Sequence, residues 1–352
     1  MRKIAPGLKI PSTQEMDALL NRGERPQLRL DWVREITGTT DPRIVAASED
    51  ASFRSYWRVL GPGISPILMD APPQREDIAA WLMIAERLRA AGLHAPAVFA
   101  SDLVNGFVLM EDLGDRTYLP ELTEHTVEQL YGEALDALLV MQRDISARDL
   151  PTYDSRRLRQ ELDLLPQWFI RKHLGVTPRL GGDDTLEAAF HTLSEGALEQ
   201  PQVFVHRDYH SRNLLITAEN SPGIIDFQDA VRGPIAYDLV SLLRDCYIEW
   251  PEAQVEEWVE RYRVRLVAAG LTHADPVTFL RWFDWMGVHR HLKVLGIFCR
   301  LWYRDGKRQY LADLPRVWGY THRIASRYEE LKPLAAILER WIDGRDLSER
   351  VR

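Results

Sequence analysis

The sequence predicts an α+β fold in two lobes: a small lobe over residues 1–112, with an antiparallel β-sheet and one main helix, and a larger, mostly helical lobe over residues 113–352. Three observations indicate this division. Short period-two segments and turn signals dominate residues 43–111. Apolar residues at helical spacing dominate most of the chain beyond residue 113. A group of short strands carrying polar residues interrupts the helical part at 203–227.

Composition and charge narrow the class of protein. The 352 residues are 45% hydrophobic and 27% charged, which is ordinary for a globular chain. A net charge of −8 argues against a nucleic-acid partner. The first 14 residues lack the apolar stretch of a signal peptide, and no run has the length of a membrane span. With Cys246 and Cys299 as reduced thiols, we expect a cytoplasmic protein with no membrane or obligate protein partner.

The small lobe is expected to begin with two helices. Ser12–Glu15 reads as a capping box that opens a short helix, and residues 28–36 form a second amphipathic piece. Asn105-Gly106 is a strong hairpin-turn signal between the last two strands. The expected strands are 44–46, 53–60, 67–69, 97–101 and 107–111, with a helix at 76–91.

Helices at 121–145, 156–173, 185–198 and 237–250 are expected to build the large lobe, and the helical pattern continues to about 341. Pro166 should kink or divide the second of these. The helix 276–303 is dense in aromatic and basic side chains. Such a stripe is more often core than ligand platform, yet this helix is the leading source of contacts to a substrate.

The stretch 203–227 carries the chemistry. An apolar strand delivers His206-Arg207-Asp208 into a polar loop, Asn213 comes five residues after Asp208, and Asp226 ends a later strand. Two carboxylates and one carboxamide are thereby set at the ends of short strands. Magnesium prefers such oxygen ligands and usually takes only one or two carboxylates beside substrate phosphates.

These parts resemble the protein-kinase core, in which a catalytic-loop Asp is followed five residues later by Asn and then by a DFG-type Asp. VFVHRDYHSRNLL and GIIDFQDAVRGPIAYDLVSLLRD resemble the aminoglycoside phosphotransferase and choline kinase branch of that superfamily. DASFRSYWRV, LMDAPP and LMEDLGDRTY are similar to bacterial anomeric amino-sugar kinases. The resemblance covers residues 44 to 245 and implies a bilobal protein-kinase-like fold with ATP and Mg²⁺ as cofactors.

For function, the resemblance implies ATP-dependent phosphorylation of the C1 hydroxyl of N-acetylmuramate and N-acetylglucosamine in peptidoglycan recycling. Asp208 would accept the proton of the sugar hydroxyl, and Asn213 and Asp226 would hold Mg²⁺. We expect His206 to fix the loop and Asp238 to cap a helix or buttress the loop. The residues expected nearest the sugar acceptor are His210, Gln228 and Asp229.

Nucleotide contacts are expected from two segments. Backbone N–H groups of Ser52 and Phe53 could meet phosphate oxygens, and Met110, Glu111 and Leu113 form the hinge whose backbone reads the adenine edge.

Two departures from the superfamily pattern fall in the small lobe. Glu49-Asp50 stands where glycines are common, and Leu68-Met69-Asp70 lacks the usual lysine of the third strand. Arg54 and Arg58 are the nearest replacement cations, and Glu76 has no evident partner.

The sequence leaves other functions open. His206, Asp208 and His210 alternate as in some metallohydrolase sites, although no second His/Asp cluster accompanies them. The missing lysine would suit a non-catalytic kinase-like binding protein. Within the kinase class, an aminoglycoside, another small alcohol or a protein hydroxyl could be the acceptor. A screen of ATP consumption against N-acetylmuramate, N-acetylglucosamine, choline and kanamycin is the most informative test.

Overall fold

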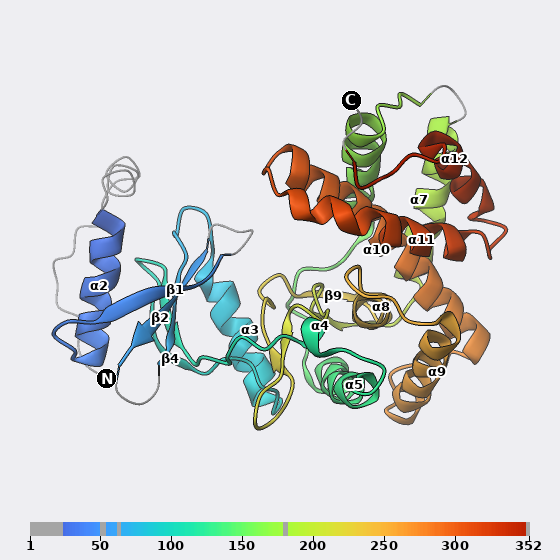
Figure 1. Cartoon of the computed structure of the whole chain (residues 1–352). Coiled ribbons are helices and arrows are strands. Elements are labelled where there is room, and N and C mark those ends of the chain that lie inside the picture. The colour runs from blue at the N-terminus through green and yellow to red at the C-terminus, as the bar shows by residue number, and fades with distance from the viewer. Residues whose placement is uncertain (1–23, 50–53, 62–64, 179–181, 350–352) are drawn as a thin grey trace. The chain divides into compact units, whose positions relative to one another are not determined.

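The computed structural model describes residues 24–49, 54–61, 65–178 and 182–349 (Figure 1). The expected capping-box helix at Ser12 lies outside these ranges. The chain divides into two compact units. The first unit consists of the chain up to Met83 together with Pro96–Asp112, and the second consists of Ile84–Ala95 together with the chain from Leu113 onward. None of the described helices is long and apolar enough to span a bilayer.

The first unit is an antiparallel sheet with a helix against it. The strand order is β1-β2-β3-β5-β4, in which the β4–β5 hairpin turns at Gly106 as predicted. Gly106 has φ +74°, and a side chain there would collide with the carbonyl oxygen of Ala71, so this turn requires glycine. The strands are β1 (Arg43–Glu49), β2 (Ser55–Leu60), β3 (Ile67–Asp70), β4 (Val98–Asp102) and β5 (Phe107–Met110).

Helix α2 (Glu24–Thr37) covers the sheet with Trp32 and Val33, which pack on Leu68 and Phe107. It also supplies charge to the sheet. Arg25 and Arg29 of α2 both pair with Asp70 at the end of β3, at 2.5 and 3.1 Å. Asp70 is only 3% exposed, so these two arginines neutralise a buried carboxylate.

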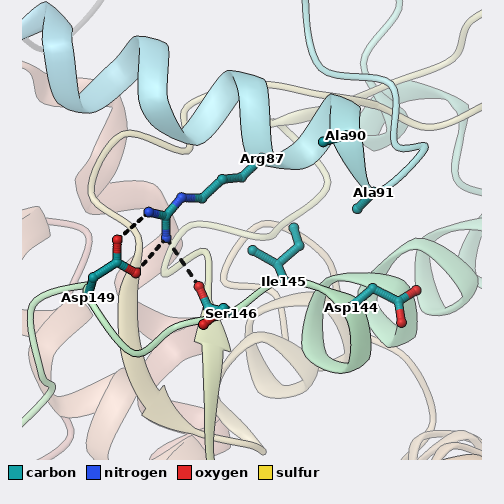
Figure 2. Close-up of a pocket in the computed structure, with 7 residues that line it drawn as sticks. All are labelled: Arg87, Ala90, Ala91, Asp144, Ile145, Ser146 and Asp149. Atoms are coloured by element: carbon teal, nitrogen blue, oxygen red, sulfur yellow. Dashed lines mark hydrogen bonds and ion pairs between the residues drawn. The ribbon is translucent and has the colours of Figure 1, made fainter.

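Helix α3 (Ile78–Ala90) begins in the first unit and ends in the second. Within the second unit its Arg87 reaches the loop after α5 (Val127–Asp144). Figure 2 shows the guanidinium bound to the carboxylate of Asp149 and to the carbonyl oxygen of Ser146. These contacts hold the loop containing Ser146 and Asp149 against the C-terminal end of α3.

The second unit is built around α10 (Pro276–Tyr303), which packs against helices on several sides. The segment predicted at 156–173 is divided at Pro166 as expected, into α6 (Ser155–Leu162) and a π-helix, Leu165–His173. Gly296 of α10 lies so close to Leu164 that an added side chain would meet its backbone at 2.5 Å. The other helices are α4 (Tyr118–Glu121), α7 (Gly182–Leu198), α8 (Tyr237–Leu243), α9 (Glu252–Ala268), a 3-10 helix (Arg308–Asp313), α11 (Leu314–Ala325) and α12 (Lys332–Ile342).

Two short strand pairs carry the polar loop inside this helical unit. The strand β6 (Gln202–Val205) pairs with β9 (Val231–Pro234), and β7 (Leu214–Leu215) pairs with β8 (Gly223–Ile224), both antiparallel. The residues of β6 and β7 facing the core are apolar and buried. The strands therefore anchor both ends of the loop 206–213 while the loop itself keeps its polar residues.

Candidate active site

The three residues expected to form the catalytic core come together in the second unit. Asp208 follows β6, Asn213 immediately precedes β7, and Asp226 comes two residues after β8. The amide nitrogen of Asn213 donates to the backbone oxygen of Asp208 at 3.0 Å and to a carboxylate oxygen of Asp226 at 3.3 Å. Gln228 donates to the other carboxylate oxygen of Asp226 at 2.9 Å.

This arrangement fits a magnesium site. Because both side-chain hydrogen bonds of Asn213 use its amide nitrogen, its side-chain oxygen is oriented away from them and keeps its acceptor capacity. Asp226, with φ +62°, presents its carboxylate next to that amide. Carboxylate and carboxamide oxygens are among the ligands that Mg²⁺ takes from a protein while it binds phosphates, and Asn213 and Asp226 supply one of each on neighbouring side chains.

His206 and Asp238 fix the start of the loop. The carboxylate of Asp238, fully buried, accepts from the backbone N–H groups of His206 at 2.6 Å and Arg207 at 3.0 Å. It lies in the first turn of α8 but is not its N-cap, which is Ala236. Burial raises the pKa of Asp238 to about 7, although the two N–H groups and Arg290 act in the opposite direction.

The imidazole of His206 links the two halves of the site through backbone groups. Its Nε2 donates to the carbonyl oxygen of Ile225 at 3.1 Å, and its Nδ1 accepts from the N–H of Asp208 at 3.3 Å. Burial lowers the pKa of His206 to about 4, which keeps the ring neutral and able to accept at Nδ1. With both nitrogens engaged by the backbone, His206 orients the loop.

Arg207 is held in a strained conformation directly before Asp208. Its φ of +78° lies in the left-handed region, which disfavours any residue with a Cβ atom. Three contacts hold it there: its N–H to Asp238, its carbonyl oxygen accepting from Arg290 at 2.9 Å, and its guanidinium bound to Glu161 at 2.7 Å. The direction in which the chain leaves Arg207 therefore sets where Asp208 lies.

Glu161 of α6 is the anion at the centre of this support. It is 8% exposed and pairs with Arg207 and with Lys293 of α10, the latter at 2.9 Å, and it accepts from the hydroxyl of Tyr153. Burial would raise the pKa of Glu161, but Lys293 and Arg207, followed by His289 and the hydroxyl of Tyr153, outweigh it and lower that pKa to about 2. Lys293 also donates to the hydroxyl of Tyr237 at 3.0 Å.

The charge of Asp208 depends on the same group of side chains. Its carboxylate is 38% exposed and lies 3.8 Å from the guanidinium of Arg290. Burial pushes the pKa of Asp208 upward, whereas Lys293 and Arg290 push it further downward, so the net direction is below the ordinary value. Asp208 is thus an ionised carboxylate near neutral pH, able to accept a proton.

The residues expected near the acceptor separate into two groups. His210 lies edge-on to Tyr247, with ring centroids 5.6 Å apart, and its Nδ1 is buried without a hydrogen-bond partner among the described residues. Asp229 is exposed. Gln228 instead belongs with Asp226, to which it donates. Contact of these residues with an acceptor stays a prediction.

The expected nucleotide residues fall in different parts of the chain. Ser52 and Phe53 lie outside the described residues. Glu111, in the first unit, donates its N–H to Ala97 at 2.8 Å and accepts from the N–H of Ala97 through its carboxylate. Met110 is buried in β5, and the side chain of Leu113, in the second unit, lies next to Gly223 of β8.

Neither candidate cation near β2 is a solvated strand arginine. Arg54 lies 3.9 Å from Glu76 and its side chain is 8% exposed, so Glu76 does have a partner. Arg58 forms a two-point contact with Asp112, the closer one at 2.5 Å. The carboxylate of Asp112, next to the hinge residue Glu111, therefore has a structural role that the sequence did not indicate.

Sequence reasoning missed Glu161 and Arg290 as parts of the site. The basic stripe of α10 is visible in the sequence, but several of its members are buried. Arg290 contacts the loop at Arg207, Lys293 binds Glu161, and His289 meets the carbonyl oxygen of Leu158. No group of three or more His, Cys, Asp or Glu side chains in the described ranges is arranged to hold a metal, so the H-x-D-x-H hydrolase interpretation gains no support.

Comparison with known proteins identifies the family. The family model described as "Phosphotransferase enzyme family" matches residues 43–276. A protein of Pseudomonas aeruginosa named N-acetylmuramate/N-acetylglucosamine kinase is 44% identical over 87% of this chain and 91% of its own. One of the same name from Pseudomonas putida is 43% identical over 84% and 87%.

Solved structures agree on the fold. An ethanolamine kinase of Plasmodium vivax superposes with a TM-score of 0.59 at 11% identity, over 91% of this chain and 96% of that one. The bilobal, protein-kinase-like α+β fold and the resemblance to the amino-sugar kinases are thus confirmed. Because the family is enzymatic, the non-catalytic interpretation is not supported. The chain belongs to the phosphotransferase enzyme family.

Proposed function

We propose that this enzyme transfers the terminal phosphate of ATP to the anomeric C1 hydroxyl of N-acetylmuramate and N-acetylglucosamine. The observation that carries the proposal is the identity of 40–44% to three kinases named for these sugars, over most of each chain. An ionised Asp208 beside the Asn213–Asp226 pair supplies a chemistry that suits such a transfer. ATP use and free buried thiols at Cys246 and Cys299 fit a cytoplasmic enzyme.

In the proposed reaction the sugar oxygen attacks the terminal phosphorus while Asp208 accepts the hydroxyl proton. The bond between that phosphorus and the bridging oxygen of ADP breaks, and the products are the sugar 1-phosphate, ADP and a proton that Asp208 returns to solvent. Asn213 and Asp226 would hold Mg²⁺, which neutralises phosphate charge when bound. An anomeric hydroxyl is more acidic than an ordinary alcohol, which lowers the demand on the base.

The nucleotide contacts complete the proposal. The carbonyl oxygen of Glu111 and the N–H of Leu113 would meet the adenine edge, because the N–H of Glu111 is already bonded to Ala97. Ser52, Phe53 and Arg54 are proposed to approach the phosphates.

The test measures ADP release with N-acetylmuramate, N-acetylglucosamine, choline and kanamycin. Phosphorylation at C1 removes the free reducing end, so loss of reducing-sugar reactivity separates it from transfer to another hydroxyl. We expect activity with the two amino sugars and its loss after Mg²⁺ is chelated. Activity confined to choline or kanamycin would overturn the acceptor assignment.

Asp208→Asn tests the base. Removing a positioned general base costs about 10²–10⁴ in rate, so kcat should fall by that factor while ATP affinity, measured by calorimetry, changes little. Turnover at the wild-type rate would show that Asp208 is not the base.

A further inference from the structure

Arg212 differs from the other cations near Asp208. Arg207 and Lys293 both bind Glu161, and Arg290 is 5% exposed and engaged with Arg207 and Tyr237. Arg212, four residues after Asp208 and directly before Asn213, is exposed. In the part of the chain that the structure describes, no carboxylate lies within ion-pair distance of its guanidinium. Its charge is therefore not neutralised by the fold.

The position of this guanidinium is nevertheless defined. It lies over the ring of Tyr247, 4.5 Å from the centroid, and such a contact holds the cation in place. Tyr247 also meets the ring of His210 and packs on Phe298, with ring centroids 6.1 Å apart. We call His210, Arg212 and Tyr247 the acceptor patch.

The acceptor patch combines the features that a sugar with a carboxylate requires. Tyr247 is half-buried, so part of this aromatic side chain is accessible beside Arg212, and aromatic side chains commonly line small-molecule sites. The buried Nδ1 of His210 has no hydrogen-bond partner within the described ranges, so this ring nitrogen keeps its capacity for a hydrogen bond to a hydroxyl. A planar guanidinium binds a carboxylate through two parallel hydrogen bonds.

We propose that Arg212 binds the lactyl carboxylate of N-acetylmuramate, while His210 and Tyr247 contact the sugar ring that both acceptors share. The inference rests on the proposed function. The two sugars differ by the lactyl ether, which carries the only carboxylate, so Arg212 becomes a residue that determines specificity. N-acetylglucosamine would use the same patch without the arginine.

The experiment compares kcat/KM for the two sugars in Arg212→Met and in Arg212→Lys. Loss of a charge-assisted hydrogen bond should lower the N-acetylmuramate value about 10- to 100-fold. The N-acetylglucosamine value should stay within about 2-fold, because that sugar has no anionic group for the arginine. Lysine, a point charge without the fork, should restore part of the loss. Tyr247→Leu should instead raise KM for both sugars, and more for N-acetylmuramate, because Tyr247 also positions Arg212.

Arg265→Met is the matched control, because Arg265 also lies over a tyrosine ring, that of Tyr262, but on α9 and paired with Asp136. It should leave both sugars unaffected. A ratio of the two kcat/KM values that is unchanged in Arg212→Met would overturn the carboxylate assignment while leaving the kinase proposal intact. If the wild-type enzyme phosphorylates neither sugar, the proposed function fails and this inference fails with it.

Discussion

Replacing Glu161 by Gln should destabilise the second unit strongly, because a buried and a half-buried cation would lose the one carboxylate that pairs with both of them among the described residues. Arg207 and Lys293 contact Glu161 at 2.7 and 2.9 Å. The side chains of Arg207, Lys293 and Glu161 are only 21%, 8% and 10% exposed, so water cannot replace the lost partner fully. Glutamine keeps the shape and one hydrogen-bond acceptor but removes the charge. The change therefore tests electrostatics more than packing.

The magnitude follows from the pKa of Glu161. Its value of about 2 in the folded protein, against an ordinary 4.5, corresponds to about 3 kcal/mol of stability at neutral pH. Breaking a buried ion pair by removing one partner costs about 3–5 kcal/mol, which agrees. Because the folded pKa is below the unfolded one, this contribution is complete above about pH 5 and is lost as the pH falls toward 2.

Urea unfolding at pH 7, followed by circular dichroism, measures the change. Glu161→Gln should lower the free energy of unfolding by about 3 kcal/mol, and Glu161→Gln with Lys293→Met should be less destabilised, since one unpaired cation is removed. Glu187→Gln is the control: Glu187 pairs with Arg159 but is 54% exposed, so its loss should cost at most about 1 kcal/mol. A Glu161→Gln protein within about 1 kcal/mol of wild type would refute the reasoning.

Two further changes test the stability of the second unit, one at a close backbone contact and one at an exposed ion pair. Gly296→Ala should destabilise it by about 1–3 kcal/mol, because the new carbon would lie 2.5 Å from the backbone of Leu164. Gly319→Ala in α11 is the control, since its new carbon meets nothing within 4 Å, and it should be neutral or stabilising. Equal shifts in the melting temperatures of the two variants would contradict this prediction. Arg87→Met removes the exposed contact to Asp149 shown in Figure 2 and should lower the free energy of unfolding by less than about 1 kcal/mol. High salt should diminish this difference between the variant and the wild type. A larger loss that does not depend on salt would mean that the contact is not chiefly ionic.

The sequence predicted the elements that depend on local pattern. The Asn105-Gly106 hairpin, the division at Pro166 and the short strands around Asp208 follow from turn chemistry, ring geometry and alternation, and the structure contains all of them. The convergence of Asn213 and Asp226 could be anticipated because Asn213 directly precedes β7 and Asp226 follows shortly after β8, which pairs with it. Such features are encoded within a few neighbouring residues.

The support behind the loop could not be predicted in the same way. Glu161 lies 46 residues before Arg207, and Arg290 lies 83 residues after it, so no spacing rule connects them. Glu161 sits in a helix of strongly polar sequence, where a solvated position is the ordinary expectation. Only the tertiary packing of α6 and α10 reveals that its charge is buried.

The pairing of Asp70 with Arg25 and Arg29 has a practical consequence for truncation. The family match begins at residue 43, yet both counter-ions of this buried carboxylate come from α2, which ends before that point. A shortened protein that starts at the matched region would leave Asp70 without the arginines that neutralise it and would uncover the apolar surface under Trp32. The smallest piece that folds by itself should therefore start upstream of the region that defines the family.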